Sequence, residues 1–139
     1  MKALAKLRLV QSGTRLFVVG GSDKKGDIRG NCYEINVETG KVEPRAELPH
    51  PRLGYGCCST PKFIYTAGGL TTGQKPTDWV DWYHVEENRW AALPNLPVKC
   101  HGLSLSVFNS NQLIAVGGSD SSHKQMTSIW RLTLEPLSR

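Results

Sequence analysis

Cysteine and histidine are the residues of this chain best suited to chemistry, because thiolates and imidazoles bind metals and act as nucleophiles or bases. The sequence holds four of each among its 139 residues. Cys57 and Cys58 are adjacent, Cys32 and Cys100 stand alone, and no Cys-x-x-Cys or His-x-x-x-His spacing occurs. Zinc sites are recognised by such spacings. The sequence therefore predicts no metal site and no cofactor.

Nucleophilic catalysis and phosphate binding have no motif in this chain. A nucleophilic serine on a sharp turn is marked by Gly-x-Ser-x-Gly, and a phosphate-cradling loop by Gly-x-x-x-x-Gly-Lys-Ser/Thr. Neither pattern occurs, and the Gly-Gly-Ser-Asp at 20–23 and at 117–120 continues a repeated glycine signature instead. We therefore expect no catalytic residues and no enzyme activity.

The cysteines fit structural roles. Adjacent residues on a strand point to opposite faces, so Cys57 and Cys58 are expected to be small core residues. Cys100 precedes His101 at the end of a predicted loop, where we expect a partly exposed thiol. A redox-sensing role for Cys100 is the alternative that this position leaves open.

The elements that must position these residues are marked by a repeated phrase of about four apolar residues followed by two glycines. The pairs are Gly20 and Gly21, Gly68 and Gly69, and Gly117 and Gly118, and their spacing is nearly constant. A fixed period of this size indicates a solenoid, a propeller or another array of repeats.

Short apolar runs separated by Gly, Pro, Asn and Asp predict an all-β chain. The expected strands are 4–10, 16–19, 32–37, a short one beginning at 41–42, 54–59, 63–67, 79–85, 89–91, 103–108, 113–116 and 129–134. They form three antiparallel units within a single domain, at about 4–46, 54–92 and 103–139, and the third ends before its fourth strand.

Large aromatic residues recur at nearly constant distances from the glycine pairs. Tyr33, Tyr83 and Trp130 each follow their pair at a similar distance, Trp90 follows the hairpin after Tyr83, and the Leu-Pro pair at 48–49 recurs at 96–97. In this combination the chain resembles the Kelch repeat, whose unit is one four-stranded blade of a β-propeller. The resemblance covers essentially the whole chain and implies about three Kelch-type blades, part of a larger propeller.

The resemblance also implies roles for its signature residues. The glycine pairs would end a strand where neighbouring chain approaches closely, and Tyr33, Tyr83, Trp90 and Trp130 would lock blade against blade. The first repeat departs from the pattern, because Val42 stands where the tryptophan is expected. All of these roles are structural.

Three blades are fewer than the four to eight of a propeller. An open array leaves two large apolar faces exposed, and faces of that size usually mark a missing partner. Two explanations follow: the chain is a fragment of a larger propeller, or two copies complete a six-bladed ring as a homodimer.

Charge and composition exclude several classes of protein. Lys and Arg outnumber Asp and Glu by 17 to 12, but no basic run or basic helix marks nucleic-acid binding. No apolar stretch reaches the roughly 18 residues needed to span a bilayer. Lys6 and Arg8 interrupt the apolar core of a secretory signal, and no Asn-x-Ser/Thr sequon occurs. We therefore expect no nucleic-acid or membrane partner, and a cytoplasmic or nuclear location.

The loops are the better candidates for function, because loops on a rigid scaffold often carry binding residues. In a Kelch-type propeller the loops after the second and fourth strands open on one face. The basic residues that we expect there, as a surface for an acidic peptide of a protein partner, are Lys24, Lys25, Arg29, Arg52, Lys75, Lys99 and Lys124. Arginine in particular suits paired hydrogen bonds to carboxylates.

The function expected from these observations is a non-catalytic protein-interaction module with an adaptor or scaffold role. By resemblance, such modules often recruit substrates to ubiquitin ligases or organise actin and other assemblies. Two alternatives stay open: a propeller-based enzyme acting on a sugar or small organic substrate, and a structural subunit of a large assembly.

Overall fold

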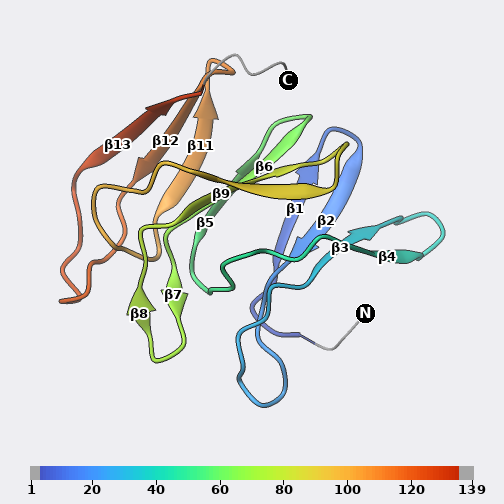
Figure 1. Ribbon diagram of the computed structural model, residues 1–139, viewed down its shortest axis with the longest axis horizontal. Helices are drawn as coiled ribbons and strands as arrows, with labels where there is room; N and C mark the ends of the chain where they lie inside the picture. The colour runs from blue at the N-terminus through green and yellow to red at the C-terminus, as the bar shows by residue number, and fades with distance from the viewer. Residues whose placement is uncertain (1–3, 135–139) are drawn as a thin grey trace.

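A computed structural model of the chain describes residues 4–134 and contains strands joined by turns and loops (Figure 1). The strands are β1 (Arg8–Ser12), β2 (Arg15–Val19), β3 (Cys32–Ile35), β4 (Val42–Arg45), β5 (Gly56–Ser59), β6 (Phe63–Ala67), β7 (Leu70–Thr71), β8 (Lys75–Pro76), β9 (Val80–His84), β10 (Arg89–Leu93), β11 (Ser104–Phe108), β12 (Gln112–Val116) and β13 (Ile129–Thr133). Within the described residues, no helix is long and apolar enough to cross a membrane.

The strands form three successive antiparallel sheets, which we call the first, middle and third blades. Their hydrogen-bonded orders are β1-β2-β3-β4, β5-β6-β9-β10 and β11-β12-β13, and β7-β8 is a separate small hairpin. The first strands of the blades are neighbours, because β5 contacts both β1 and β11. The blades stack face to face as an open array (Figure 1). The expected all-β, Kelch-type fold is confirmed.

The middle blade is buried on both faces, which explains its nearly continuous apolar strands. All five residues of β6 are buried. Ile64 belongs to a core shared with Phe17 of the first blade, and Tyr65 belongs to a core shared with Leu113 of the third. Alternate residues of one strand thus hold the neighbouring blades together.

The glycine pairs end strands where the chain entering the next blade passes closely. Gly68 has a φ of +66°, and a Cβ placed on it would lie 2.6 Å from the Cys100 carbonyl oxygen and 2.8 Å from Leu103 Cδ2. Any larger residue at position 68 would combine an unfavourable φ with a steric clash. The glycine therefore allows the middle and third blades to approach each other.

The aromatic signature residues of the middle blade lie against the first blade. Tyr83 is fully buried. Its ring lies edge-on to the Phe17 ring, with the ring centroids 5.8 Å apart, and is tilted against the Trp90 ring, with the centroids 5.0 Å apart. The Trp90 indole Nε1 donates a hydrogen bond of 2.8 Å to the Ala46 carbonyl. This directed bond adds to the apolar contact between the first and middle blades.

Several elements differ from the predicted ones. β1 begins at Arg8 rather than residue 4, and Pro44 lies inside β4 rather than in the following loop. The predicted loop at 70–77 contains the hairpin β7-β8, which no alternation of residue types reveals. The last part of the predicted third blade, 135–139, lies outside the described residues.

Candidate interaction surface

Three loops of similar conformation project from the same end of the array, and we call this end the loop face (Figure 1). They span 22–30, 70–77 and 119–127 and connect the second and third strands of each blade. The bonds that close them run from the nitrogens of Arg29, Thr77 and Met126 to the oxygens of Gly21, Gly69 and Gly118, at 2.8, 2.9 and 2.9 Å. The loops therefore form a periodic surface on a shared scaffold.

Each loop is also fastened to the segment that enters its own blade. Paired backbone hydrogen bonds of 2.7 to 3.0 Å join Ala5 to Ser22, Leu53 to Leu70, and His101 to Ser119. The three entering residues are equally spaced along the sequence. Because these bonds recur at each blade, the bases of the loops are held in place rather than free.

Aspartate shapes the two outer loops. The Asp23 carboxylate accepts hydrogen bonds from the backbone nitrogens of Lys25 and Asp27, at 2.9 and 3.0 Å. Asp120 does the same for Ser122 and Lys124, at 2.8 and 3.0 Å. Such Asx bonds fold the backbone into a turn. The Gly-Gly-Ser-Asp sequence therefore specifies a loop structure in addition to ending a strand.

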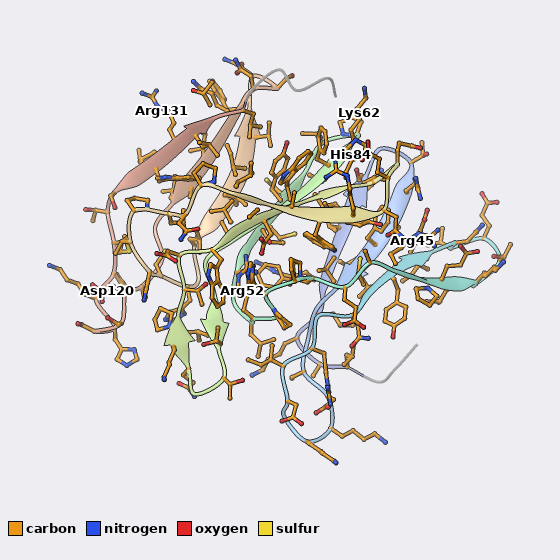
Figure 2. The ribbon with its side chains drawn as sticks, in the orientation of Figure 1. Arg45, Arg52, Lys62, His84, Asp120 and Arg131 are labelled. Carbon is orange, nitrogen blue, oxygen red and sulfur yellow. The ribbon has the colours of Figure 1, made fainter. Side chains whose placement is uncertain are left out.

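The predicted lysines lie where a partner could reach them. Lys24, Lys25, Lys75, Lys99 and Lys124 are all exposed, and none forms an ion pair with another residue of the described chain. Figure 2 shows Asp120 in the loop that also carries Lys124, and Lys62 at the opposite end of the molecule. The loop face therefore presents ammonium groups that no described carboxylate pairs with.

Arg29 is engaged within its own loop. Its Nε and Nη2 atoms donate hydrogen bonds of 2.9 and 2.7 Å to Asp23 Oδ2, and Asp27 lies 3.9 Å away. The bonds from Arg29 lower the pKa of Asp23 from its ordinary value. A partner would have to compete with this pair, so Arg29 is less available than the lysines.

The prediction that Arg52 contacts a partner is wrong, because its side chain is completely buried (Figure 2). Arg52 donates to the carbonyls of Gly68 and His50, to Thr66 Oγ1 at 3.1 Å and to Asp81 Oδ2 at 3.1 Å. Burial lowers the pKa of Arg52, and the Asp81 carboxylate opposes that shift. Arg52 is a structural residue of the middle blade.

His50, which belongs to no sequence motif, lies beside the Arg52–Asp81 pair. His50 Nδ1 lies 3.0 Å from Asp81 Oδ2, and its ring stacks on Trp79 at 4.6 Å with an interplanar angle of 19°. The available signal was Asp81 itself, a carboxylate within the apolar stretch of β9, which requires a polar or cationic partner. The cluster fastens the loop before β5 to the middle blade.

The cysteine side chains offer little reactivity. Cys100 is 3% exposed, so the expectation of a partly exposed thiol is wrong. Burial raises the pKa of Cys100, and raises that of Cys32 to about 12. High thiol pKa values leave little nucleophilic thiolate at neutral pH. In the described part of the chain, no three His, Cys, Asp or Glu side chains group as a metal site.

A hollow between two of the loops completes the surface. A cavity of about 300 Å³ separates the β7-β8 hairpin from the 119–127 loop. Its lining includes Leu70, Gln74, Pro76, His101, Asp120 and His123. This space is large enough for a side chain of a bound peptide and lies beside the loops that carry Lys75 and Lys124.

Comparison with known proteins supports the repeat assignment. A family model described as the Kelch motif matches residues 51–97. An F-box/kelch-repeat protein, SKIP30 of Arabidopsis thaliana, is 30% identical over 107 residues, which cover 69% of this chain and 30% of that protein. Beta-scruin and alpha-scruin of Limulus polyphemus are 27% and 25% identical, covering 77% and 82% of this chain but 12% and 13% of the scruins.

The chain spans less than a third of the length of each of these relatives. Their similarity extends over most of this chain, and the motif match coincides with the blade that has the complete set of signature residues. The strand order of that blade agrees with the repeat unit. The chain belongs to the Kelch-repeat family.

Proposed function

We propose that this chain is a non-catalytic protein-interaction module, with an adaptor or scaffold role, that binds an acidic segment of another protein on its loop face. The relatives, an F-box/kelch-repeat protein and the scruins, support an interaction or structural module. The observation that carries the proposal is the array of three like loops with exposed lysines that pair with no described carboxylate. The cytoplasm or the nucleus is the proposed location, on the sequence alone.

The charge distribution favours lysine over arginine as the binding group. Arg52 is buried in an ion pair with Asp81, and Arg29 forms an ion pair with Asp23. The lysines are therefore the positive charges that remain available to a partner. A single exposed lysine–carboxylate pair contributes only about 0.2–1 kcal/mol. Binding therefore requires several lysines acting together on a segment with several carboxylates, and such binding weakens as salt screens the charges.

The test is the affinity for a fluorescent glutamate-rich peptide as a function of salt. The variant Lys24→Gln/Lys75→Gln/Lys124→Gln removes one charge from each loop and should weaken binding by roughly tenfold, at about 0.5 kcal/mol per lysine. Lys62→Gln is the control, because Lys62 lies at the opposite end of the molecule (Figure 2). Equal affinity for the triple variant and the wild type would exclude the loop lysines as the binding surface.

A structural role within a larger assembly is the second candidate, favoured by the unpaired faces of the outer blades. Phe108, Val116 and Ile129 of the third blade are 56%, 44% and 69% exposed. Val116 pairs directly with Ile129, and adjacent exposed apolar side chains indicate an association surface. Whether a partner occupies the loops or these blade faces separates the two roles, and hydrogen exchange of the bound complex distinguishes them.

A further inference from the structure

Side chains at fixed distances from the glycine pairs make the contacts between blades. Residues one and three positions before a glycine pair face the following blade. In the first blade these are Val19 and Phe17, which share a core with Ile64 of the middle blade. Residues two and four positions before it face the preceding blade, as Leu113 and Ala115 do. The same rule thus describes both contacts in the described chain.

This rule identifies two faces without a neighbour among the described residues. On the third blade, Ile114 and Val116 occupy the positions that face a following blade, and Val116 pairs with Ile129, which is 69% exposed. On the first blade, Leu16 and Val18 occupy the positions that face a preceding blade; Val18 is already buried at 4% exposure, whereas Leu9, which pairs with it, is 67% exposed. Both free faces are apolar.

The glycines show what the free face of the third blade lacks. A Cβ at Gly20 would lie 3.1 Å from Tyr55 Oη of the following blade, and one at Gly68 would lie 2.8 Å from Leu103 Cδ2 of the blade after it. A Cβ at Gly117 would meet nothing within 4 Å. The space beside Gly117 is therefore the place for a residue equivalent to Tyr55 and Leu103.

The first blade has that residue. Leu7, Tyr55 and Leu103 are equally spaced along the sequence, so Leu7 is the equivalent of the other two in the first repeat. Leu7-Arg8-Leu9 repeats Leu103-Ser104-Leu105 in its pattern of leucines. Leu105 packs within 3.0 Å of a Cβ placed on Gly56, the middle-blade equivalent of Ser104. By the same contacts, Leu7 would fill the space at Gly117, and Leu9 would lie on Ser104.

We propose that a second copy of this chain occupies both free faces, with the first blade of each copy on the third blade of the other. The two contacts are identical, and each continues the blade-to-blade contact already present twice within the chain. A second copy suits these faces because it offers one of each, so both described faces are covered. The six blades that result fall within the four to eight of closed propellers, and two head-to-tail contacts close the ring.

The first measurement is the mass of the purified chain in solution by light scattering. The proposal predicts a particle of twice 15.4 kDa. A stable monomer across the accessible concentrations would overturn it. Open polymers that grow with concentration would also overturn it, because a head-to-tail contact that does not close forms filaments.

A charge exchange tests the contact itself. Leu9→Glu places a carboxylate against Ser104 in both contacts of the dimer, and Ser104→Lys places an ammonium group against Leu9 in both. Each variant alone should be monomeric. Mixed together they should form a heterodimer, because one of its contacts is then wild type and the other pairs Glu with Lys.

Matched controls separate this result from misfolding. Leu9 is 67% exposed and Ser104 is also exposed, so neither substitution disturbs the core, and circular dichroism of each variant should match that of the wild type. Thr72→Glu, at an exposed loop tip, should leave the dimer intact. Failure of the folded mixture to recover the dimer would contradict the Leu9–Ser104 contact.

Discussion

Arg52 and Asp81 form a charge pair with almost no access to water, since their side chains are 0% and 1% exposed. The guanidinium also satisfies the carbonyls of Gly68 and His50. Replacing one residue of such a pair destabilises the fold, because the other ion loses its charged partner while it stays buried. Asp81 also holds the His50 ring where it stacks on Trp79.

Arg52→Met should therefore lower the free energy of unfolding by about 3–5 kcal/mol, because the buried Asp81 carboxylate would lose its guanidinium partner and keep only the His50 ring. Urea unfolding followed by tryptophan fluorescence measures this change. The double variant Arg52→Met/Asp81→Leu should recover much of the loss. As a control, Arg89→Met removes an exposed partner of Glu87 and should cost less than about 1 kcal/mol. A loss below about 1 kcal/mol for Arg52→Met would contradict the role of the Arg52–Asp81 pair as a buried ion pair on which the fold depends.

Glu34 provides a second test at the residue scale, through pH. Hydrogen bonds from Arg15, aided by those from Arg45, lower the pKa of Glu34 from 4.5 to about 2. A carboxyl whose pKa is lower in the folded state stabilises the fold above the unfolded value, and this contribution disappears as pH falls. Wild type should exceed Glu34→Gln in stability by about 1 kcal/mol at neutral pH.

That difference should shrink as the pH falls from about 4.5 towards 2, because Glu34 becomes protonated whereas the amide of the variant does not titrate. Denaturant unfolding of both proteins at several pH values measures it. The opposite trend, a difference that grows in acid, would show that the Arg15 and Arg45 bonds do not act on the ionised carboxylate.

The loops make up the next scale, and each turn places backbone in the left-handed region. The residues are Gly26 in the first loop, Gly73 and Gln74 in the second and His123 in the third, with φ values of +85°, +80°, +57° and +61°. Glycine adopts this region without strain, whereas for other residues it costs about 1–2 kcal/mol. The outer loops thus share a turn but differ in its strain.

His123→Gly should raise the stability of the chain by up to about 1 kcal/mol, the relief of strain being partly offset by the greater freedom of glycine in the unfolded state. Thermal unfolding of the variant measures the gain. Lys124→Gly is the control, since position 124 has no positive φ, and it should give no gain. A loss on His123→Gly would mean that the imidazole contributes contacts that outweigh the strain.

The repeat determines which elements could be predicted. Strands next to the glycine pairs are predicted well, and β6 has the predicted bounds of Phe63–Ala67. Arg52 could not be placed, because its charge favours exposure and its partner Asp81 is 29 residues away in the sequence. The β7-β8 hairpin has two residues in each strand, too few for a pattern. The periodic sequence pattern predicts the strands, whereas a buried polar pair such as Arg52–Asp81 depends on tertiary packing, which the pattern does not show.

At the scale of the whole molecule, stability depends on how many neighbours each blade has. In stacked repeats, each unit gains stability from its contacts with adjacent units. Within the described chain only the middle blade has neighbours on both faces, as the burial of β6 and most of β9 shows. In β13, three of five residues are exposed. The outer blades should therefore open more easily than the middle one.

Amide hydrogen exchange in dilute solution should consequently be slowest in β6 and β9 and faster in β2 and β12. Raising the protein concentration should then protect β2 and β12 selectively, because association covers Leu9, Leu16, Ile114 and Val116 with a second copy. Binding to the folded state stabilises it by mass action. The loop at 70–77 serves as an internal reference, since its exchange should not depend on concentration. Equal protection of all three blades at every concentration would contradict both expectations, because the three blades would then open together and association would add nothing to the stability of the outer two.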